Sequence, residues 1–396
     1  MPKDNETLKE LRTDLRYLWI HRHGNETPAA ISDTIDALYP KLKPLIVKRI
    51  KLSETVWRLL VTLPPGLGYA EFKRYEQLFA DATGGHVEIT KHGKTVMMEV
   101  LTEELKIMYP FTLWDPSNYD SMYLPIPFGM SATGIIVRDL TDFPHCFIAG
   151  ETNFGKSNML HVIANSIILN RPETMVYIID LKRTEFSYLR DYALCVSELK
   201  EALTVLKALN SELDKRLKIL EFARCVKIQK YLKKGGEMPF VVLIVDELAE
   251  LKDKACQESL ERLGRLGRAC GIHLVAATQR PSSKLYETFG DIKALFACRM
   301  CFLVADAINS NMVLDSDRAA YLPAIKGRAI YKWGLDIHEV QTLFLDPDDA
   351  EEMLTQKFGS MPKVVNPFAD LDESSKMLPP RQRPLLPAGK GRSARH

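Results

Sequence analysis

The chain has 396 residues, of which 46% are hydrophobic, and this length and composition allow two or three folded domains. They do not indicate a disordered chain, because a disordered chain has too little apolar surface to bury. Lysine and arginine number 53 against 51 aspartate and glutamate, so the formal charge of +2 neither supports nor excludes a polyanionic partner. Any basic surface must therefore be local.

Seven scattered cysteines indicate reduced thiols rather than a disulfide framework. The close pair Cys298 and Cys301 lies in an apolar run that predicts a buried strand, with metal binding or redox chemistry as the alternative. No apolar stretch approaches the roughly 18 to 20 residues needed to span a bilayer, and the N-terminus is charged rather than signal-like. We therefore expect a cytoplasmic protein that reaches a membrane only through a partner.

The first part of the chain divides into three regions. Residues 1–50 are rich in leucine and charge at helical spacing, which predicts a helical N-terminal region. Residues 51–110 follow the order strand, helix, strand, strand, which predicts a small α+β domain. Residues 111–125 are rich in proline and tyrosine. Because proline fixes φ and removes a donor, we predict a connector and the main domain boundary there.

The second part has the pattern of an α/β domain followed by a tail. Over residues 126–345, short β-branched strands alternate with helical segments, which predicts a mostly parallel sheet with helices on both faces. Residues 346–396 begin as an acidic helix start and pass into a basic, proline-rich tail with too few apolar residues to fold alone. The tail either neutralises phosphates or is a plain solvated end.

The most informative segment of this second part is GETNFGKS, residues 150–157, between an apolar strand and a helix. It matches the phosphate-binding pattern G-x-x-x-x-G-K-[ST] in the strand-loop-helix context that this pattern requires. A phosphate chain needs backbone N–H donors at a helix N-terminus, glycines for close approach, a lysine for the β/γ oxygens and a hydroxyl for Mg²⁺. We therefore predict that ATP and Mg²⁺ bind here. The predicted nucleotide-binding residues are Gly150, Glu151, Thr152, Asn153, Phe154, Gly155, Lys156, Ser157 and Asn158.

A second buried strand ends in two carboxylates. Residues 240–245 are all apolar, so the strand is predicted to be covered on both faces and to deliver Asp246 and Glu247 to its C-terminal edge. We predict that Asp246 joins Ser157 as a metal ligand and that Glu247 activates the attacking water, while Lys156 contacts the phosphates. The alternative is that the two acids only cap the next helix, and the roles can coexist.

Two further strands carry candidate catalytic residues. The strand GIHLVAAT ends at Gln279, which we predict to sense the γ-phosphate, with a simple strand cap as the alternative. The strand ALFACRMCFLV contains Arg299, and a charge inside an apolar run is costly unless it reaches a partner or an edge. We predict that Arg299 is an arginine finger, with Arg268 as the competing candidate and a structural salt bridge as the alternative.

Together these segments resemble the FtsK/SpoIIIE family of DNA translocases, within the wider FtsK–HerA group of P-loop motors. The resemblance runs over about 220 residues, and the string RACGIHLVAATQRP carries more of it than the phosphate-loop pattern does. It implies a RecA-like motor preceded by a small α/β domain, acting as a hexameric ring around DNA with ATP between subunits. By position, Arg299 resembles the arginine that a neighbouring subunit contributes.

Three positions depart from the family pattern. Asn153 and Phe154 replace small residues in the phosphate loop, although asparagine is the non-glycine residue most tolerant of left-handed φ. Leu181 stands where the family usually has proline, and Asn311 stands where it often has arginine. These departures affect the expected coupling geometry rather than nucleotide binding.

The resemblance leaves rival functions open. No family-type membrane segments precede the motor and no winged-helix module follows it, so the chain resembles the short FtsK-type proteins of conjugative and integrative elements. Such a protein would translocate DNA or couple DNA to transfer, with a relaxase, replication proteins or a membrane channel as partners. A protein-secretion ATPase with FtsK-like domains is the alternative, although such proteins usually carry several motors in tandem. A scaffold that binds ATP without turnover is disfavoured by the intact Lys156, Asp246 and Glu247.

Overall fold

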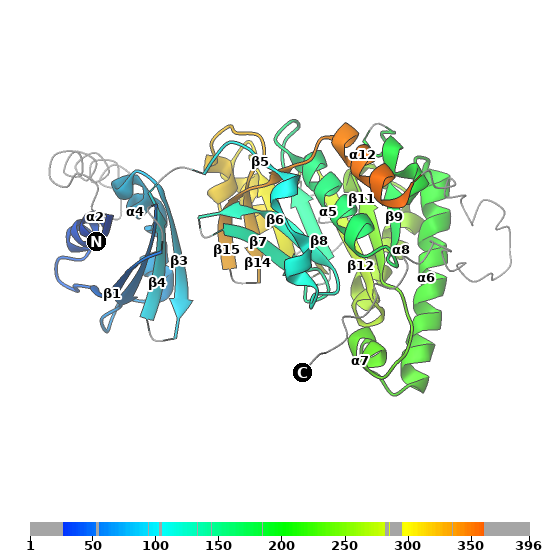
Figure 1. Cartoon of the computed structure of the whole chain (residues 1–396), viewed down its shortest axis with the longest axis horizontal. Coiled ribbons are helices and arrows are strands. Elements are labelled where there is room, and N and C mark those ends of the chain that lie inside the picture. The colour runs from blue at the N-terminus through cyan, green and yellow to red at the C-terminus, as the bar shows by residue number, and fades with distance from the viewer. Residues whose placement is uncertain are drawn as a thin grey trace, which may run out of the picture. The chain divides into compact units, whose positions relative to one another are not determined.

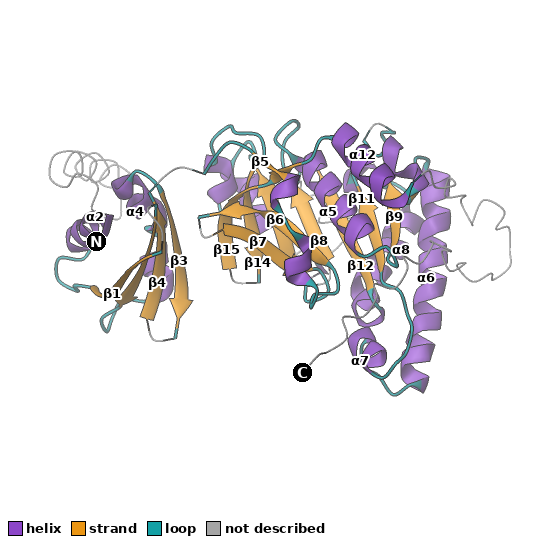
Figure 2. Ribbon diagram, in the orientation of Figure 1, coloured by secondary structure: helices purple, strands orange, loops and turns teal. Residues whose placement is uncertain are grey.

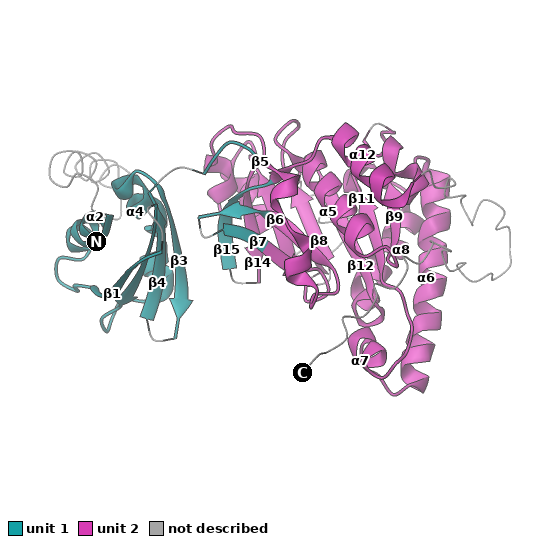
Figure 3. Cartoon of the chain, in the orientation of Figure 1, with its two compact units in different colours: residues 1–109, 129–136, 335–342 teal, residues 110–128, 137–334, 343–396 magenta. Residues whose placement is uncertain are grey.

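A computed structural model gives the fold for residues 27–359, apart from residues 53–54, 94, 103–104, 133, 144, 184, 282–284, 286–294 and 335. Residues 1–26 of the predicted helical region and residues 360–396 of the predicted tail lie outside these described residues. Packing divides the chain into two compact units (Figure 3). Unit 1 comprises Met1–Tyr109, Gly129–Ile136 and Leu335–Thr342, and unit 2 comprises Pro110–Phe128, Val137–Gly334 and Leu343–His396.

Unit 1 contains a four-stranded antiparallel sheet in the order β1-β2-β4-β3. Alternate residues of its strands, such as Leu59 and Val61 on one strand and Met98 and Val100 on its neighbour, are buried with helical residues in one apolar cluster. This period of two is what a sheet with one face on a core requires. The elements are α2 (Thr27–Leu38), β1 (Leu45–Lys51), β2 (Val56–Thr62), α3 (Tyr69–Lys73), α4 (Glu76–Thr83), β3 (His86–His92) and β4 (Thr95–Leu101).

Strand β1 corrects one expectation. The sequence predicted a helical region over residues 1–50, but Leu45–Lys51 form a strand that pairs antiparallel with β2. Ile46, Val47 and Ile50 are β-branched and favour strands, and the pairing supplies the ladder hydrogen bonds that a local charge pattern cannot reveal. The helical spacing is realised farther upstream, in α2.

The second and larger sheet has ten strands in the order β10-β9-β11-β12-β8-β13-β14-β15-β6-β7 (Figure 1). The six strands from β10 to β13 are parallel to their neighbours, and the pairs β13/β14 and β15/β6 are antiparallel. The strands are β6 (Pro125–Ser131), β7 (Gly134–Asp139), β8 (His145–Ala149), β9 (Met175–Ile179), β10 (Leu194–Val196), β11 (Val241–Val245), β12 (Ile272–Thr278), β13 (Cys298–Phe302), β14 (Arg328–Trp333) and β15 (Asp336–Gln341).

Helices connect and cover these parallel strands (Figure 2). Every residue of β8, β9 and β11 is buried, and because successive side chains point to opposite faces, both faces of the sheet are covered. The predicted α/β fold with a mostly parallel sheet is therefore confirmed. The principal helices are α5 (Lys156–Asn170), α6 (Leu199–Phe222), α7 (Ile228–Lys233), α8 (Lys254–Leu266), α11 (Ala307–Leu314) and α12 (Pro347–Phe358), and a short pair joins β5 (Tyr109–Pro110) to β16 (Leu343–Phe344).

The parallel arrangement fixes where a site can form. Strands β8, β9, β11 and β12 run in the same direction, so their C-terminal ends share one edge of the sheet. In such sheets, ligands bind outside the carboxyl ends of the strands. Among the residues that the structure describes, no helix is long and apolar enough to cross a bilayer.

Candidate functional site

The phosphate loop, residues 150–157, connects β8 to α5 with an unusual backbone. Gly150, Asn153 and Gly155 have φ values of 155°, 69° and 115°. A Cβ on Gly150 would lie 2.6 Å from the Phe302 Cβ, and one on Gly155 would lie 3.0 Å from the Gly327 Cα, so both positions require glycine. Asn153 occupies the left-handed region that asparagine tolerates. The loop is therefore pressed against the end of β13 and against Gly327.

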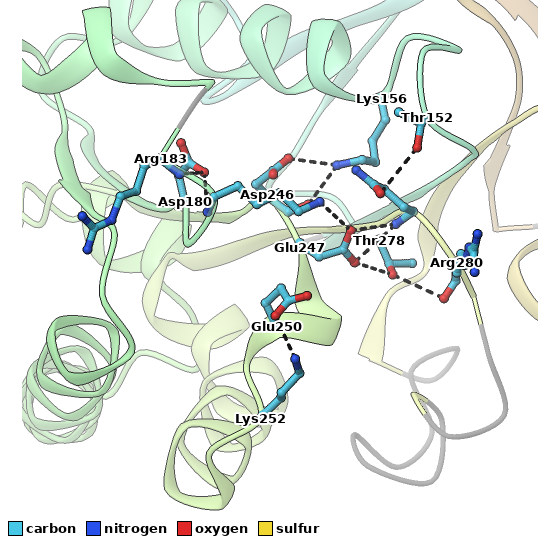
Figure 4. Close-up of polar contacts among 12 residues, drawn as sticks. Thr152, Lys156, Asp180, Arg183, Asp246, Glu247, Glu250, Lys252, Thr278 and Arg280 are labelled. Atoms are coloured by element: carbon cyan, nitrogen blue, oxygen red, sulfur yellow. Dashed lines mark hydrogen bonds and ion pairs between the residues drawn. The ribbon is translucent and has the colours of Figure 1, made fainter.

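Lys156 and Asp246 form a buried ion pair at the C-terminal edge of β11 (Figure 4). The Lys156 Nζ lies 2.9 Å from the Asp246 Oδ1 and donates to the Asp246 carbonyl at 3.0 Å. Only 4% of Lys156 and 2% of Asp246 are exposed. A buried ammonium is tolerated when a carboxylate neutralises it. The pair therefore holds the lysine at the edge where the phosphate loop meets α5.

Glu247 is fixed at the point where three strands end. Its carboxylate accepts hydrogen bonds from the Thr278 hydroxyl at 2.7 Å and from the Gln279 N–H at 3.1 Å, and it lies 3.4 Å from the Lys182 Nζ (Figure 4). Glu247 follows β11, Thr278 and Gln279 end and follow β12, and Lys182 lies in the turn after β9. Charge-assisted hydrogen bonds of this kind orient a carboxylate without removing its charge. Thr278 and Lys182 are thus supports for Glu247 that the sequence did not assign.

Gln279 lies between Glu247 and the phosphate loop. Its backbone N–H bonds to Glu247, and its side-chain Oε1 is 3.5 Å from the Thr152 hydroxyl. Thr152 is exposed at the tip of the loop. Gln279 therefore touches both halves of the site, which is the position that a phosphate sensor would need.

Three other predicted nucleotide-binding residues, Glu151, Phe154 and Asn158, form hydrogen bonds to chain segments outside the loop. The Glu151 N–H bonds to the Leu303 carbonyl at 3.1 Å, and the Phe154 carbonyl accepts from the Gly327 N–H at 2.9 Å. The Asn158 amide is directed away from the loop: it donates to the Leu343 carbonyl and accepts from the Leu345 N–H. We therefore assign Asn158 a role in anchoring the chain after β16 as well as its predicted place in the nucleotide site.

Arg299 is held at the C-terminus of α11. Its Nη1 donates to the Val313 carbonyl at 2.9 Å and to the Asp315 carboxylate at 3.0 Å. Lys332 contacts the same carboxylate at 2.9 Å. Cations near the last carbonyls of a helix are favoured by its dipole. The structure thus gives Arg299 the structural ion pair that the sequence left open, and its predicted action on a neighbouring subunit stays a prediction.

Arg268 occupies a different place. It lies in the exposed turn that precedes β12, and β12 begins at Ile272. It is therefore at the N-terminal edge of the parallel strands, opposite the phosphate loop of the same chain. Arg268 cannot complete the site of its own chain.

The residues at the C-terminal edge fit a magnesium nucleotide by their chemistry. Mg²⁺ takes few protein ligands, usually one or two carboxylates, together with phosphate oxygens and water. Ser157 lies at the start of α5 and Asp246 at the end of β11, and both offer oxygen atoms. The turn of α5 supplies backbone N–H groups and Lys156 a positive charge, which suit phosphates.

Comparisons with known proteins agree with this geometry. Residues 114–283 match the FtsK/SpoIIIE family. The chain is 34% identical over 263 residues to the DNA translocase FtsK of Chlorobaculum tepidum, which covers 61% of this chain and 31% of that protein. It is 36% identical over 211 residues to the DNA translocase FtsK of Treponema pallidum, which covers 49% of this chain and 26% of that protein. The match therefore spans under a third of either relative.

Two solved structures have a similar fold. The pCW3 conjugation coupling protein TcpA, in a monomer form with ATPγS, superposes with a TM-score of 0.60 at 25% identity and covers 84% of this chain and 99% of that chain. The cytoplasmic domain of the Type VII secretion ATPase EccC of Thermomonospora curvata superposes with a TM-score of 0.54 at 22% identity, over 65% of this chain and 33% of that chain. The second likeness extends to the fold alone.

Proposed function

We propose that the chain is an ATP-driven DNA translocase or DNA-transfer coupling ATPase, because residues 114–283 match the FtsK/SpoIIIE family and the chain is similar to DNA translocases. The observation that supports this most is the cluster of Lys156, Asp246 and Glu247 at one sheet edge, next to the phosphate loop. A scaffold without turnover would not need Glu247 oriented by three separate donors.

Each residue of the cluster has a proposed part in hydrolysis. Lys156, which pairs with Asp246, would face the β/γ-phosphate oxygens. Ser157 and Asp246 would hold Mg²⁺, which would supply charge neutralisation at the phosphates. Glu247 polarises the attacking water, since its carboxylate is oriented by Thr278 and Gln279. Gln279 reports whether the γ-phosphate is present, because its side chain reaches Thr152.

We propose DNA as the track and transfer of a mobile genetic element as the setting. The relatives at 34% and 36% identity are DNA translocases. The solved structure whose chain is aligned over 99% of its length is a conjugation coupling protein. We further propose a hexameric ring, with a relaxase, replication proteins or a membrane channel as partners. Such a protein would work in the cytoplasm and be recruited to the membrane by a partner.

A neighbouring subunit is proposed to contribute an arginine. Arg299 is the candidate predicted from its strand position, but it must first leave Asp315 and the α11 carbonyl. Arg268 is exposed at the opposite edge of the sheet, which suits a contact with another subunit's site. An arginine finger stabilises charge that develops in the transition state and contributes about 10³–10⁵-fold in rate.

Mixing experiments separate the two arginines. Lys156→Ala subunits would be mixed with Arg268→Ala subunits and, separately, with Arg299→Ala subunits, and ATPase activity would be measured once mixed assemblies are shown by mass. A mixed ring contains some interfaces with an intact lysine and an intact arginine, so partial activity from two inactive proteins supports action in trans. Full activity of Arg299→Ala alone would exclude Arg299 and leave Arg268.

A protein-secretion ATPase is the competing function. The likeness to EccC at 22% identity reaches only the fold, so it does not favour secretion over DNA transport. The deciding experiment is an ATPase assay of the full chain alone, with single-stranded DNA, with duplex DNA and with unfolded protein. We expect at least one form of DNA to stimulate turnover. If neither does while protein does, the secretion function takes its place.

A further inference from the structure

The C-terminal end of α6, the turn after it and α7 lie together in unit 2, and none of the roles assigned above uses them (Figure 1). We call residues 218–237 the α6–α7 tip. Six of its basic side chains are exposed, against two exposed carboxylates, so this part of a nearly neutral chain has a local positive charge. The exposed cations are Lys218, Arg224, Lys227, Lys230, Lys233 and Lys234.

These cations differ from those of α8, the helix that packs against α6. On α8, the Lys254 Nζ lies 3.7 Å from a Glu258 oxygen, and the Arg265 Nη1 lies 3.5 Å from a Glu261 oxygen. Within the part of the chain that the structure describes, no carboxylate lies at ion-pair distance from any of the six exposed cations of the tip. Cations that the fold does not neutralise are available to the phosphates of a polyanion.

An apolar stripe lies among the cations of the tip. Ile219, Phe222 and Val226 follow one another at spacings of three and four residues, and they are 42%, 93% and 81% exposed. Single apolar side chains are ordinary on a protein surface, but a contiguous group rimmed by polar residues is typical of an interaction site. Because Arg224 and Lys227 are interleaved with the stripe, the ligand that fits is anionic and also offers an apolar or aromatic face.

Contacts on the inner side of the tip fix its position. Ile228 is buried, and its Cδ1 lies 2.5 Å from where a Cβ on Gly271 would be, directly before β12. The Lys234 Nζ donates to the Ala223 carbonyl at 3.1 Å, so the C-terminal end of α7 lies beside the residue that follows Phe222. The aromatic ring and the lysines of α7 are therefore presented together on an ordered backbone, which lowers the entropic cost of binding.

We propose that the α6–α7 tip is a contact surface for single-stranded DNA, in which Phe222 stacks on an unpaired base while Lys230 and Lys233 contact phosphates. Proteins that bind single strands combine a positively charged surface with aromatic side chains on which bases stack. Bases inside a duplex stack on one another and offer no free face to such a ring. The tip therefore selects the form of DNA that the nucleotide site leaves open. This inference rests on the proposed function, since it concerns the DNA on which that function acts.

The test compares the affinity of the full chain for a labelled oligothymidine and for a labelled duplex of equal length, by fluorescence anisotropy. We expect Phe222→Ala to weaken oligothymidine binding about 5- to 100-fold, the usual effect of losing one stacking side chain, and to leave duplex binding unchanged. Phe222→Trp keeps an aromatic face and should bind as wild type does. Leu199→Ala, which truncates an exposed apolar residue at the other end of α6, is the matched control and should have no effect.

A pair of lysine substitutions tests the phosphate contacts separately. Each contact to a single strand adds about 0.7 to the slope of log affinity against log salt concentration, so Lys230→Gln with Lys233→Gln should make that slope about 1.4 shallower. Lys254→Gln with Arg265→Gln is the matched control, because it also removes two exposed cations, but ones that pair with carboxylates of their own helix. Its salt slope should equal that of the wild type.

The outcomes separate this inference from the function on which it rests. If wild-type protein binds neither form of DNA, the proposed function fails. If wild type binds DNA, and Phe222→Ala and the lysine pair bind it equally well, the inference alone is wrong. Equal weakening of oligothymidine and duplex binding by Phe222→Ala would also overturn it, because the ring would then not stack on an unpaired base. Binding of polyglutamate that these variants lose, with DNA binding unchanged, would assign the tip to an acidic protein instead.

Discussion

The two edges of the parallel strands in unit 2 each bury a positive charge, but they hold it with different sets of partners. At the C-terminal edge, Lys156 contacts only Asp246, through two of its three N–H donors as far as the described residues show. At the N-terminal edge, Arg216 of α6 is 1% exposed and bonds to the Pro239 and Cys270 carbonyls and to Glu212. Lys156 is held by a single residue of the site, whereas Arg216 joins a carboxylate of its own helix to the carbonyls of two other segments.

In this sheet, one edge contributes to the stability of the fold and the other edge carries the candidate site. Arg216 satisfies carbonyls that immediately precede β11 and β12, so it fastens the starts of two central strands. Lys156 and Glu247 lie where strands end, and their partners Asp246, Thr278 and Gln279 are at strand ends as well. We therefore expect substitutions at the C-terminal edge to change catalysis and those at the N-terminal edge to change the free energy of unfolding.

Glu247→Gln tests the catalytic edge and has the largest expected effect. The amide keeps the shape and an acceptor for Thr278, but it cannot act as a base, so turnover should fall about 10²–10⁴-fold while ATP binding and the unfolding midpoint stay unchanged. Steady-state ATPase rates, nucleotide titration and thermal unfolding measure the three quantities. Normal hydrolysis by this variant would show that another group orients the water.

Arg216→Met tests the opposite edge. Methionine fills similar volume but leaves two buried carbonyls without their donor and Glu212 without its partner, so the free energy of unfolding should drop by about 3 kcal/mol. The ATPase rate per folded molecule should not change. Urea denaturation and active-site titration provide the measurements, with Glu212→Gln as the milder control. A variant that folds but does not hydrolyse ATP would show that the N-terminal edge affects catalysis as well as stability.

His145 adds a pH dependence to the N-terminal edge. Burial, with a smaller contribution from His273, lowers the pKa of His145 to about 3, well under its ordinary 6.5. The unfolded chain therefore binds a proton at this residue as pH falls through 6.5, while the folded chain does not. Its contribution to stability is complete above pH 6.5 and is lost toward pH 3, by at most about 1.4 kcal/mol per pH unit.

Substituting His145 isolates that contribution. His145→Gln retains an acceptor for the Leu274 N–H but does not titrate, so urea midpoints between pH 7 and 5 should fall less steeply than in wild type. Hydrolysis at pH 7.5 should be unaffected. An identical pH slope in both proteins would mean that this histidine does not set the acid sensitivity.

A pair of substitutions at Asn153 gives the smallest effect at the catalytic edge. Its φ of 69° suits asparagine and glycine, so Asn153→Gly should change the free energy of unfolding by no more than about 0.5 kcal/mol. Valine in the same conformation should cost about 1–2 kcal/mol. Thermal unfolding compares the two variants. Equal behaviour of glycine and valine would show that the loop adopts another backbone in solution.

The positions of several residues at the C-terminal edge could be predicted, because each follows from a short stretch of sequence and from the direction of its strand. An apolar strand followed by a polar residue places that residue at a known edge of a parallel sheet, which holds for Asp246 and Gln279. Lys156 reaches the same edge through the phosphate loop that follows β8. The α/β fold follows from the same alternation of strands and helices. Their roles in hydrolysis are still predictions, since position alone does not measure chemistry.

What the sequence did not reveal depends on pairing between distant segments. The sequence shows Arg299 as a charge within an apolar run, but its ion pair with Asp315 could not be predicted, because it forms only when α11 packs beside β13. Residues 45–51 form a strand because they pair with β2, although their local charge pattern predicted a helix. Glu185 lies beside His161 although 24 residues separate them, and no local pattern predicts that contact. The one available signal was a histidine in the helix after the phosphate loop, because a buried polar side chain usually has a polar partner.

The clamping of the phosphate loop has a thermodynamic consequence. Phe302 and Gly327 press on its two glycines, and hydrogen bonds from the Glu151 N–H to Leu303 and from the Gly327 N–H to Phe154 tie both of its sides to the chain around β13 and β14. The entropy of ordering this segment is therefore lost during folding rather than during nucleotide binding. A nucleotide would then meet amide groups that are already arranged, so little of its interaction free energy would be used to order the loop.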